Sequence, residues 1–424
     1  MESSFYVENR RALLARMEHS LAVVFSGEAP RKTNDEYYPF FTNRNFIYLT
    51  GIDQCDATLL LAATGNGGTN GPNGADTAGS ETLFIPPSDL IAERWTGTRV
   101  KGAEASAISG VKDIQFTNAF SIALDRALLS GEYSAIYLPL YKHAAGESDG
   151  PEYRLVRYLS ERFPHIVIKD LMPHLKALRL IKKPCEIAAM REAQKDTREG
   201  ILAMMRASRP GMMEYEYKAE FDYALMKRGV LTPAFPSIIS AGKNNFSIHY
   251  HSYTGQAQDG DMVLNDVGAW RDNLMTDVSR GWPCNGRFSE RQRLLYQCAF
   301  DCSNHMFGVI KPGMLQGEVV PAWKHFTYER LRDIGLCKSF DDIGTYMWHG
   351  GDHHVGFDVH DVVAVTPATP LAPGMVFSVD IGIYCEEWGI GFRLEDDCLV
   401  TEGGCENLSR DTPRSIEEIE AVMA

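Results

Sequence analysis

Long apolar runs, a surplus of basic residues and closely paired cysteines are all missing from this sequence. No stretch approaches the roughly 18 uninterrupted apolar residues that a membrane-spanning helix needs. The formal net charge of −14 argues against a nucleic-acid partner held on a broad basic surface. The nine cysteines are odd in number and form no CxxC pair, so we interpret them as reduced thiols.

The start of the chain also lacks the features of a targeting segment. Charges are scattered through the first 20 residues, and no apolar core precedes a small-residue cleavage site. We therefore expect a cytoplasmic protein with no membrane partner.

The length and the patterning indicate two domains. At 424 residues, the chain is too long for one ordinary hydrophobic core. Helical and strand patterns alternate up to about residue 172, which predicts an α/β domain over residues 1–172 and a second domain over 173–424. The first domain is predicted to hold a helix over 5–18 and apolar strands over 20–27, 45–52, 57–63, 82–87 and 134–140. The segment 64–80 is rich in Gly, Asn and Thr, which predicts a flexible hairpin excursion.

The second domain begins with helical patterns. Residues 167–212 are strongly helical, with Pro184 at a helix start and Pro210-Gly211 at a stop. A further helix is predicted over 213–228, ending at Gly229. The apolar strands that follow are interrupted by clustered acids and histidines, which is where we expect the chemistry.

Two β-prone runs, 262–270 and 274–282, are joined by a short polar turn and predict a hairpin that carries acids. If the turn centres between Arg271 and Asp272, Asp266 lies directly opposite Asp277. Their Cβ atoms would then be about 4.5–5.5 Å apart on one face, where like charges repel each other.

A second hairpin is predicted near the end of the chain, from runs 374–384 and 389–401. A turn centred between Glu387 and Trp388 sets Asp380 opposite Glu395, with Arg393 on the same strand face. One buried acid pair can share a proton, whereas two such pairs favour a divalent metal or a metal pair. The alternative is that both hairpins are edge ribbons whose acids lie in water.

Histidines gather in HGGDHHVGFDVHD (349–361), which holds four of the twelve in the chain. His349 and His353 are spaced for one helical face, but Gly350-Gly351 argues against a helix there. We interpret this segment as part of a site. Upstream, His249 is a candidate for substrate contact, and a plain strand histidine is the alternative.

These segments, in this order, resemble the creatinase/aminopeptidase P/methionine aminopeptidase family, which has the pita-bread fold. The likeness covers nearly the whole chain and implies an N-terminal creatinase-like α/β domain and a C-terminal pita-bread α+β catalytic domain. It is carried by DEYYPFFTNRNFIYLTGID (35–53), KALRLIKKPCEIAAMREA (176–193), IHY (248–250), DGDMVLNDVGAW (259–270), TDVSRGWPCNGRFSERQ (276–292), HGGDHHVGFDVHD (349–361), LAPGMVF (371–377) and GFRLEDD (391–397).

The resemblance implies a dinuclear metal site. In it Asp266 chelates one divalent ion, Asp277 and Glu395 bridge both, and His353 with Asp380 completes the other. A hydroxide held by the ions would attack the scissile carbonyl of a small peptide. Catalytic roles are implied for His249, His360, Asp380 and Arg393, and substrate-binding roles for His349, His354 and Tyr384.

The implied function is that of a metallo-aminopeptidase of the Xaa-Pro type, which releases the N-terminal residue next to proline. The ligand set suits Mn²⁺ best, and Fe²⁺, Co²⁺ or Zn²⁺ would also fit. By resemblance we also expect a homodimer.

One departure keeps other functions open. The family usually has Glu-Pro-Gly where this chain reads Asp380-Ile381-Gly382, and His354 stands where a large apolar residue is common. A shorter side chain at Asp380 motivates a second hypothesis, a lyase or small-amide hydrolase on the same metal site. A third is a binding module that has lost catalysis.

Overall fold

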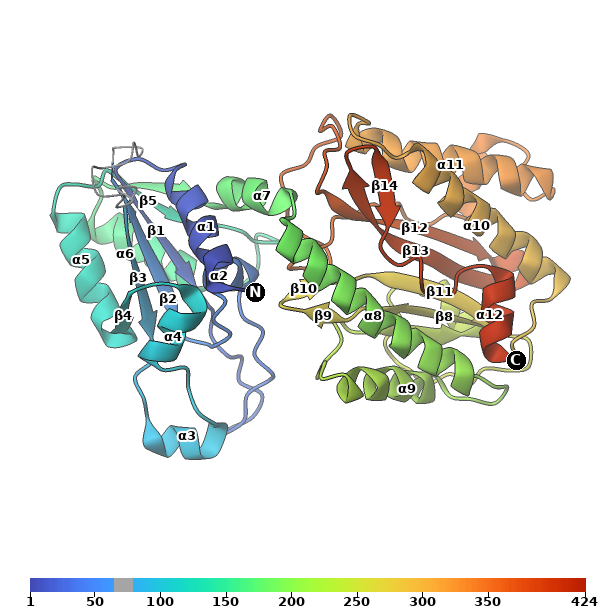
Figure 1. Cartoon of the computed structure of the whole chain (residues 1–424), viewed down its shortest axis with the longest axis horizontal. Helices are drawn as coiled ribbons and strands as arrows, with labels where there is room; N and C mark the ends of the chain where they lie inside the picture. Colours follow the sequence, from blue (N-terminus) through green and yellow to red (C-terminus); the bar gives the residue numbers. More distant parts are fainter. Residues whose placement is uncertain (65–78) are drawn as a thin grey trace. The chain divides into compact units, whose positions relative to one another are not determined.

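The computed structural model describes residues 1–64 and 79–424, and its contacts divide the chain into two units, Met1–Leu178 and Arg179–Ala424 (Figure 1). The division falls inside helix α7 (Met172–Leu180), which begins where the domain boundary is expected. The predicted flexible excursion over 64–80 lies, apart from its ends, outside the described residues. Among the described residues no helix is long and apolar enough to cross a membrane.

The N-terminal unit is built on one mixed sheet of six strands in the order β4-β3-β2-β1-β5-β6. Strand β1 pairs antiparallel with β2 and parallel with β5, so two types of connection meet at the centre of the sheet. Its elements are α1 (Ser3–Leu14), β1 (Ser20–Phe25), α2 (Arg44–Thr50), β2 (Thr58–Ala63), β3 (Gly79–Ile85), α3 (Leu90–Thr96), α4 (Gly102–Ser109), β4 (Asp113–Phe116), η1 (Thr117–Ala119), α5 (Phe120–Leu129), β5 (Ala135–Leu138), α6 (Pro151–Arg162) and β6 (Val167–Asp170).

Four of the five predicted strands are confirmed, but the run 45–52 forms helix α2 instead. Its side chains are β-prone, yet Asn43 caps the helix by accepting hydrogen bonds from the Asn45 and Phe46 amides. Gly51, in the left-handed conformation, ends it. Every residue of α2 is buried, so apolar and polar residues do not alternate with a helical or a strand period. Periodicity therefore could not distinguish a helix from a strand in this run. The beginning of the predicted helical stretch was also wrong, because residues 167–170 form edge strand β6.

The C-terminal unit contains the acid-rich hairpins and the longest helices. Its elements are α8 (Pro184–Ala207), α9 (Glu214–Lys227), β7 (Ile238–Ala241), η2 (Gly242–Phe246), β8 (Met262–Val267), β9 (Trp270–Arg271), β10 (Leu274–Met275), β11 (Val278–Pro283), α10 (Glu290–Val309), α11 (Gln316–Asp333), η3 (Phe340–Thr345), β12 (Val376–Cys385), η4 (Glu386–Trp388), β13 (Ile390–Thr401), β14 (Gly404–Asn407) and α12 (Ile416–Met423).

Helices α8 and α9 start where the sequence predicts. Pro184 occupies the first turn of α8, where its missing N–H costs nothing, and the Glu186 side chain accepts from the Lys183 amide. Helix α9 starts at Glu214, and its end precedes Gly229, which has a φ of +79°.

Two three-stranded antiparallel sheets, β11-β8-β7 and β12-β13-β14, form the centre of this unit. Helix α9 contacts β7 of the first sheet, and α8 packs on α9 and on the β9–β10 ribbon (Figure 1). Helix α10 packs on the second sheet, and α11 packs on α10. One continuous apolar core, with Trp282, Trp323 and Phe392 fully buried, fills the space between these elements. Strands β8, β12 and β13 are buried along almost their whole length, so an acid on them is taken out of water unless it faces a cavity.

Candidate metal centre

The first acid hairpin forms, but its register differs by two residues from the prediction. Asp266 pairs with Ser279 rather than with Asp277, which lies just before β11. The reason is the turn: Asp272 and Asn273 both have positive φ, 48° and 68°, and form a two-residue connection between β9 and β10. An even shift preserves the face of the sheet, so both acids still point to the same side.

The second acid hairpin has the predicted register. Asp380 of β12 lies directly opposite Glu395 of β13, in an unbroken ladder that runs from Val376 to Cys385. Residues Gly382 and Tyr384 follow Asp380 on the same face, and Arg393 pairs with Gly382. A side chain at Gly382 would collide with His349, since an added Cβ would lie 2.4 Å from its Nε2 atom.

The acids of both hairpins line one cavity of about 310 Å³. The four acids, Asp266, Asp277, Asp380 and Glu395, come from β-strands or their ends, and the histidine segment supplies further lining residues. The lining residues are Ile248, His249, Asp266, Asp277, His349, Gly350, Gly351, Asp352, His353, His360, Asp380, Arg393 and Glu395.

Hydrogen bonds to strand β12 hold the histidine segment beside the cavity. The Ser378 amide donates to the His353 carbonyl at 2.9 Å, and the Ser378 hydroxyl donates to the Gly351 carbonyl at 2.7 Å. Gly351 is required for this approach, because a Cβ there would lie 2.4 Å from that of Asp380. The imidazole of His353 therefore faces the acids, with its Nε2 atom 3.3 Å from Asp277 Oδ2.

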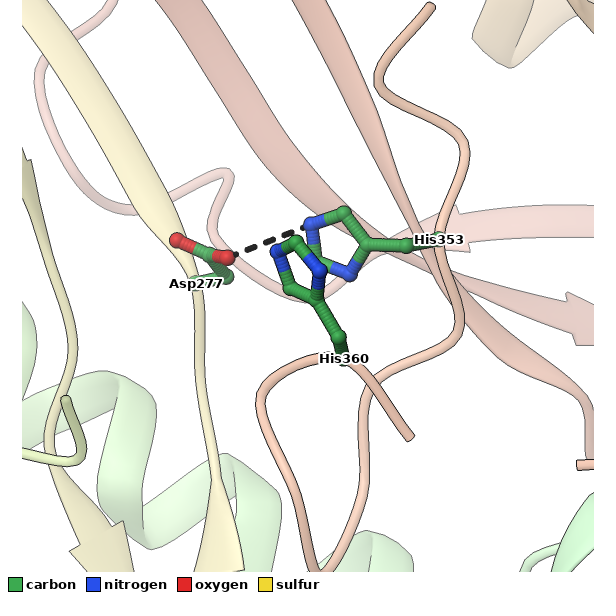
Figure 2. A group of neighbouring side chains, drawn as sticks. All are labelled: Asp277, His353 and His360. Atoms are coloured by element: carbon green, nitrogen blue, oxygen red, sulfur yellow. Dashed lines mark ion pairs between the residues drawn. The ribbon is translucent and has the colours of Figure 1, made fainter. Parts of the chain in front are cut away.

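Two overlapping groups of side chains have ligand atoms close enough to share a cation. Asp266, Asp277 and Glu395 form one, and Asp277, His353 and His360 form the other; within each group the ligand atoms lie within 4.8 Å of one another. Figure 2 shows the second group, with the imidazoles of His353 and His360 stacked and both near the Asp277 carboxylate. Asp277 belongs to both groups, which is the arrangement that a bridging ligand requires.

The electrostatics of the acids favour a positive charge in this cavity. Burial, and then the Glu395 carboxylate, raise the pKa of Asp277 well above its ordinary value, and the same two causes raise the pKa of Asp380. Burial lowers the pKa of His353, but its interactions with Asp277 and Glu395 outweigh burial and raise it. A group of acids that attracts protons in this way also stabilises a bound cation.

Arg393 compensates one acid of the first hairpin. Its guanidinium donates to Asp266 Oδ2 at 2.8 Å, so that the pKa of Asp266 is lowered even though burial acts to raise it. The same side chain donates to the Ile248 carbonyl at 3.1 Å. Arg393 therefore connects β13 with β8 and with the segment that carries His249.

Carboxylate oxygens without hydrogen-bond partners indicate that these residues can bind a divalent ion. Asp266, Asp277 and Asp380 each have a buried Oδ1 atom that finds no hydrogen-bond partner among the described residues. Buried carboxylate oxygens without partners are costly, and coordination to a cation is the ordinary way to offset that cost. Carboxylates with one or two imidazoles are ligands for Mn²⁺, Fe²⁺, Co²⁺ or Zn²⁺.

Asp380 lies in the cavity but belongs to neither of the two ligand groups. Its Oδ2 atom is 3.2 Å from Nδ1 of His349, and the hydroxyl of Tyr384 lies 3.0 Å from the other ring nitrogen of that histidine. Burial, and then the Arg393 charge, lower the pKa of His349 to about 4.

Two residues expected to bind substrate do not line the cavity. His354 is 3% exposed and its ring faces Gln316 and Phe377, because neighbouring residues of an extended segment point to opposite sides. Tyr384 is fully buried, and it reaches the site through hydrogen bonds to His349 and Arg393. Both residues contact the walls of the site rather than the space inside it.

The sequence reasoning missed three polar residues behind the acids. The Ser279 hydroxyl donates to Glu395 Oε2 at 2.9 Å. Oδ2 of the buried Asp397 accepts from the Asp277 amide at 3.1 Å and from the Gln194 side chain at 2.6 Å. The only signal in the sequence is spacing, since Asp397 lies two residues beyond Glu395 and so shares its strand face.

Comparisons with known proteins agree with this geometry. The family model for metallopeptidase family M24 matches residues 188–402, and that for the aminopeptidase P N-terminal domain matches residues 6–137. The chain is 30% identical to the Xaa-Pro aminopeptidase of Escherichia coli (strain K12), an alignment that covers 99% of this chain and 97% of that protein. The chain therefore belongs to metallopeptidase family M24, and its two-domain architecture is that of aminopeptidase P.

Solved structures support the same assignment. A Bacillus anthracis protein provisionally assigned to aminopeptidase P matches with a TM-score of 0.94 and 34% identity, covering 100% of this chain and 98% of that one. Zinc-substituted aminopeptidase P from Escherichia coli, in complex with product, matches with a TM-score of 0.88 and 29% identity, covering 100% and 98%. Membership of M24 makes this chain a metallopeptidase that uses divalent metal ions.

Proposed function

We propose that this member of family M24 is a metal-dependent Xaa-Pro aminopeptidase, which releases the N-terminal residue of a peptide when the next residue is proline. The observation that carries the proposal is the joint lining of one cavity by Asp266, Asp277, His353 and Glu395. The similarity to Xaa-Pro aminopeptidases along nearly the whole chain supports the substrate class.

In this proposal Asp266, Asp277, His353, Asp380 and Glu395 hold two divalent ions. Ions bound there would lower the pKa of a water molecule and polarise the scissile carbonyl. His249 and His360, which line the same cavity, contact the substrate and hydrogen-bond to the oxygen on which charge develops. Arg393 holds Asp266 in place, and His349 orients Asp380.

The ion that we propose is Mn²⁺, because the ligand set contains four carboxylates and a single imidazole. A homodimer and a cytoplasmic location remain proposals that rest on the sequence. Elemental analysis of purified protein and its mass in solution test the metal and the oligomer.

The alternative chemistry suggested by Asp380, a lyase or small-amide hydrolase reaction, is not favoured by the comparisons, which match Xaa-Pro aminopeptidases. Gly351 packs against the Asp380 side chain, since a Cβ added at Gly351 would lie 2.4 Å from the Cβ of Asp380.

The activity is tested on metal-loaded protein with Xaa-Pro dipeptides, longer Xaa-Pro peptides and small non-peptide amides. We expect release of the N-terminal residue from Xaa-Pro peptides and loss of that release when Asp277→Asn removes the shared ligand. Metal-loaded protein that is inert on every peptide of the panel would contradict the proposal. Asp380→Glu is the companion variant, and a sharp rise in peptidase activity would instead favour native specialisation for another reaction.

A further inference from the structure

A fully buried carboxylate lies outside the metal-site cavity, at the first residue of α9. Glu214 is 0% exposed, and each of its two oxygens accepts two hydrogen bonds. Oε1 accepts from the Ala241 amide and from the Asn244 side chain, both at 2.9 Å. Oε2 accepts from the Tyr250 hydroxyl at 2.8 Å and from the Gly255 amide at 2.6 Å.

All four donors belong to one segment, residues 241–255, which runs from the end of β7 past His249. They lie at its beginning, its middle and its end. The Glu214 amide also donates to the Gly255 carbonyl at 2.9 Å, so the end of the segment is held twice. One side chain thus fixes the course of a stretch of fifteen residues.

The segment is shaped to approach this carboxylate. A Cβ at Gly255 would lie 2.5 Å from Glu214 Oε1 and 2.4 Å from the Asn244 side chain, so only glycine fits there. Gly242 has a φ of +55°, a conformation that residues with a Cβ adopt only under strain. These two glycines let the chain bend around Glu214.

His249 depends on the course of this segment. Its imidazole lines the metal-site cavity but makes no hydrogen bond to any other described residue. The neighbouring Ile248 carbonyl accepts from Arg393 at 3.1 Å, which fixes the backbone on the cavity side. Glu214 holds the same segment at Ala241, Asn244, Tyr250 and Gly255.

We propose that Glu214 is a positioning residue, whose buried carboxylate holds the 241–255 segment so that His249 meets the substrate at the metal centre. This inference rests on the proposed role of His249 in Xaa-Pro peptide hydrolysis. A carboxylate is required because four donors converge on two oxygens, and an ionised acid accepts all four.

The most informative variant is Glu214→Gln, which keeps the shape of the side chain. The glutamine side chain has an NH2 group in place of one carboxylate oxygen. In either orientation this NH2 group faces a backbone N–H, that of Ala241 or that of Gly255, and a backbone N–H cannot accept a hydrogen bond. We expect kcat/KM on an Xaa-Pro peptide to fall roughly tenfold to a hundredfold, the usual range when a catalytic group is displaced by about 1 Å. The loss should fall on kcat, with metal content unchanged.

Glu216→Gln is the matched control on the same helix turn. Glu216 accepts from the Met213 amide at 2.7 Å in the first turn of α9 and makes no hydrogen bond to the 241–255 segment. It should lower thermal stability without an effect on kcat. An equal loss of kcat in both variants would mean that Glu214 merely stabilises α9, and would overturn the proposal.

A double-mutant cycle with His249→Ala separates positioning from general destabilisation. If Glu214 acts through His249, Glu214→Gln should cost less than about twofold once the imidazole is gone. The same tenfold to hundredfold loss in the His249→Ala background would overturn the proposal.

Tyr250→Phe provides the second test if Glu214→Gln does not fold. It removes one of the four bonds, and we expect faster amide hydrogen exchange across residues 241–255 with a few-fold loss of kcat. Unchanged exchange there would contradict the inference. Wild-type protein that is inert on Xaa-Pro peptides would refute the proposed function, whereas the exchange measurement would still report on the role of Glu214.

Discussion

The two acid hairpins deliver carboxylates to the same cavity, but they arrange them differently. In β12–β13 the acids Asp380 and Glu395 lie directly opposite each other in an unbroken ladder. In β8–β11 a neutral partner, Ser279, lies opposite Asp266, and Asp277 stands just outside the strand. The first arrangement concentrates like charge at one level of the sheet, whereas the second spreads it and frees Asp277 to face both Glu395 and His353.

The buried negative charge of the two hairpins is therefore compensated in different ways. Arg393 already balances Asp266, whose pKa is lowered in spite of burial. Asp277 and Asp380 face the imidazoles of His353 and His349 instead of a guanidinium, and burial and Glu395 still raise their pKa values. A divalent ion is therefore needed most where Glu395 meets these two acids.

Glu395→Gln gives the largest expected effect and tests this conclusion directly. Loss of the shared charge should lower metal affinity and reduce peptidase activity by about a thousandfold or more. The metal-free protein should instead become more stable, by about 1 kcal/mol, because repulsion of Asp277 and Asp380 is relieved. Calorimetry with and without metal measures whether the variant is less stable than wild type when metal is bound and more stable when it is absent. A similar loss of stability in both states would contradict the difference proposed between the two hairpins.

Arg393→Gln tests the other hairpin. It leaves Asp266 buried without its cation, and such a loss costs about 3–5 kcal/mol in the metal-free protein. Urea unfolding should show a smaller cost once metal is bound, because the ions replace the missing charge. Arg393→Lys is the control that keeps the charge. A similar loss of stability in both variants would show that the shape of the guanidinium, rather than its charge, is essential.

Metal binding should weaken as the pH falls. In the metal-free protein the pKa values of Asp277 and Asp380 are raised, so a bound ion must displace protons from them. Each proton released makes the affinity about tenfold weaker per pH unit below the raised pKa. Titrations in buffers of different ionisation enthalpy measure the protons released. Binding that does not vary with pH would imply that both acids are already ionised.

The smallest expected effects concern the turns. Asn273→Ala and Gly389→Ala each place alanine at positive φ, 68° and 66°, which costs about 1 kcal/mol because alanine tolerates this conformation less well than asparagine or glycine. Gly403→Ala, at a turn with no positive φ and open space around the Cβ, is the control and should be nearly neutral. Thermal unfolding measures all three. An unequal cost at Asn273 and Gly389 would show that one turn contributes more to its hairpin than conformation alone.

Most of the metal-site geometry could be predicted from the sequence because strand periodicity assigns faces. The register of β12–β13 followed from symmetry about Glu387 and Trp388. The predicted register of β8–β11 was wrong because Asp272 and Asn273, both with positive φ, centre the turn one residue later than expected. The position of His354 was unpredictable, since it depends on how a segment without regular structure lies against β12. Tyr384 lies on the expected face of β12, but its hydroxyl contacts His349 and Arg393 instead of the cavity.

The helix α2 and the carboxylate of Glu214 were beyond sequence reasoning for a related reason. Capping by Asn43 overrides the strand preference of α2, and propensity is a weak guide for a short buried run. Glu214 looks like an ordinary acid in the first turn of a helix, where acids are common. Its partners are distant in sequence, at residues 241–255, and only the fold brings them together.

The displacement of the β8–β11 pairing by two residues shows which errors of register the metal site tolerates. A slip of two residues gives Asp266 a new partner but leaves its carboxylate on the cavity side. A slip of one residue would move every side chain of the strand to the other face and turn that carboxylate toward the apolar core. The parity of the register, rather than its exact value, therefore keeps Asp266 at the cavity.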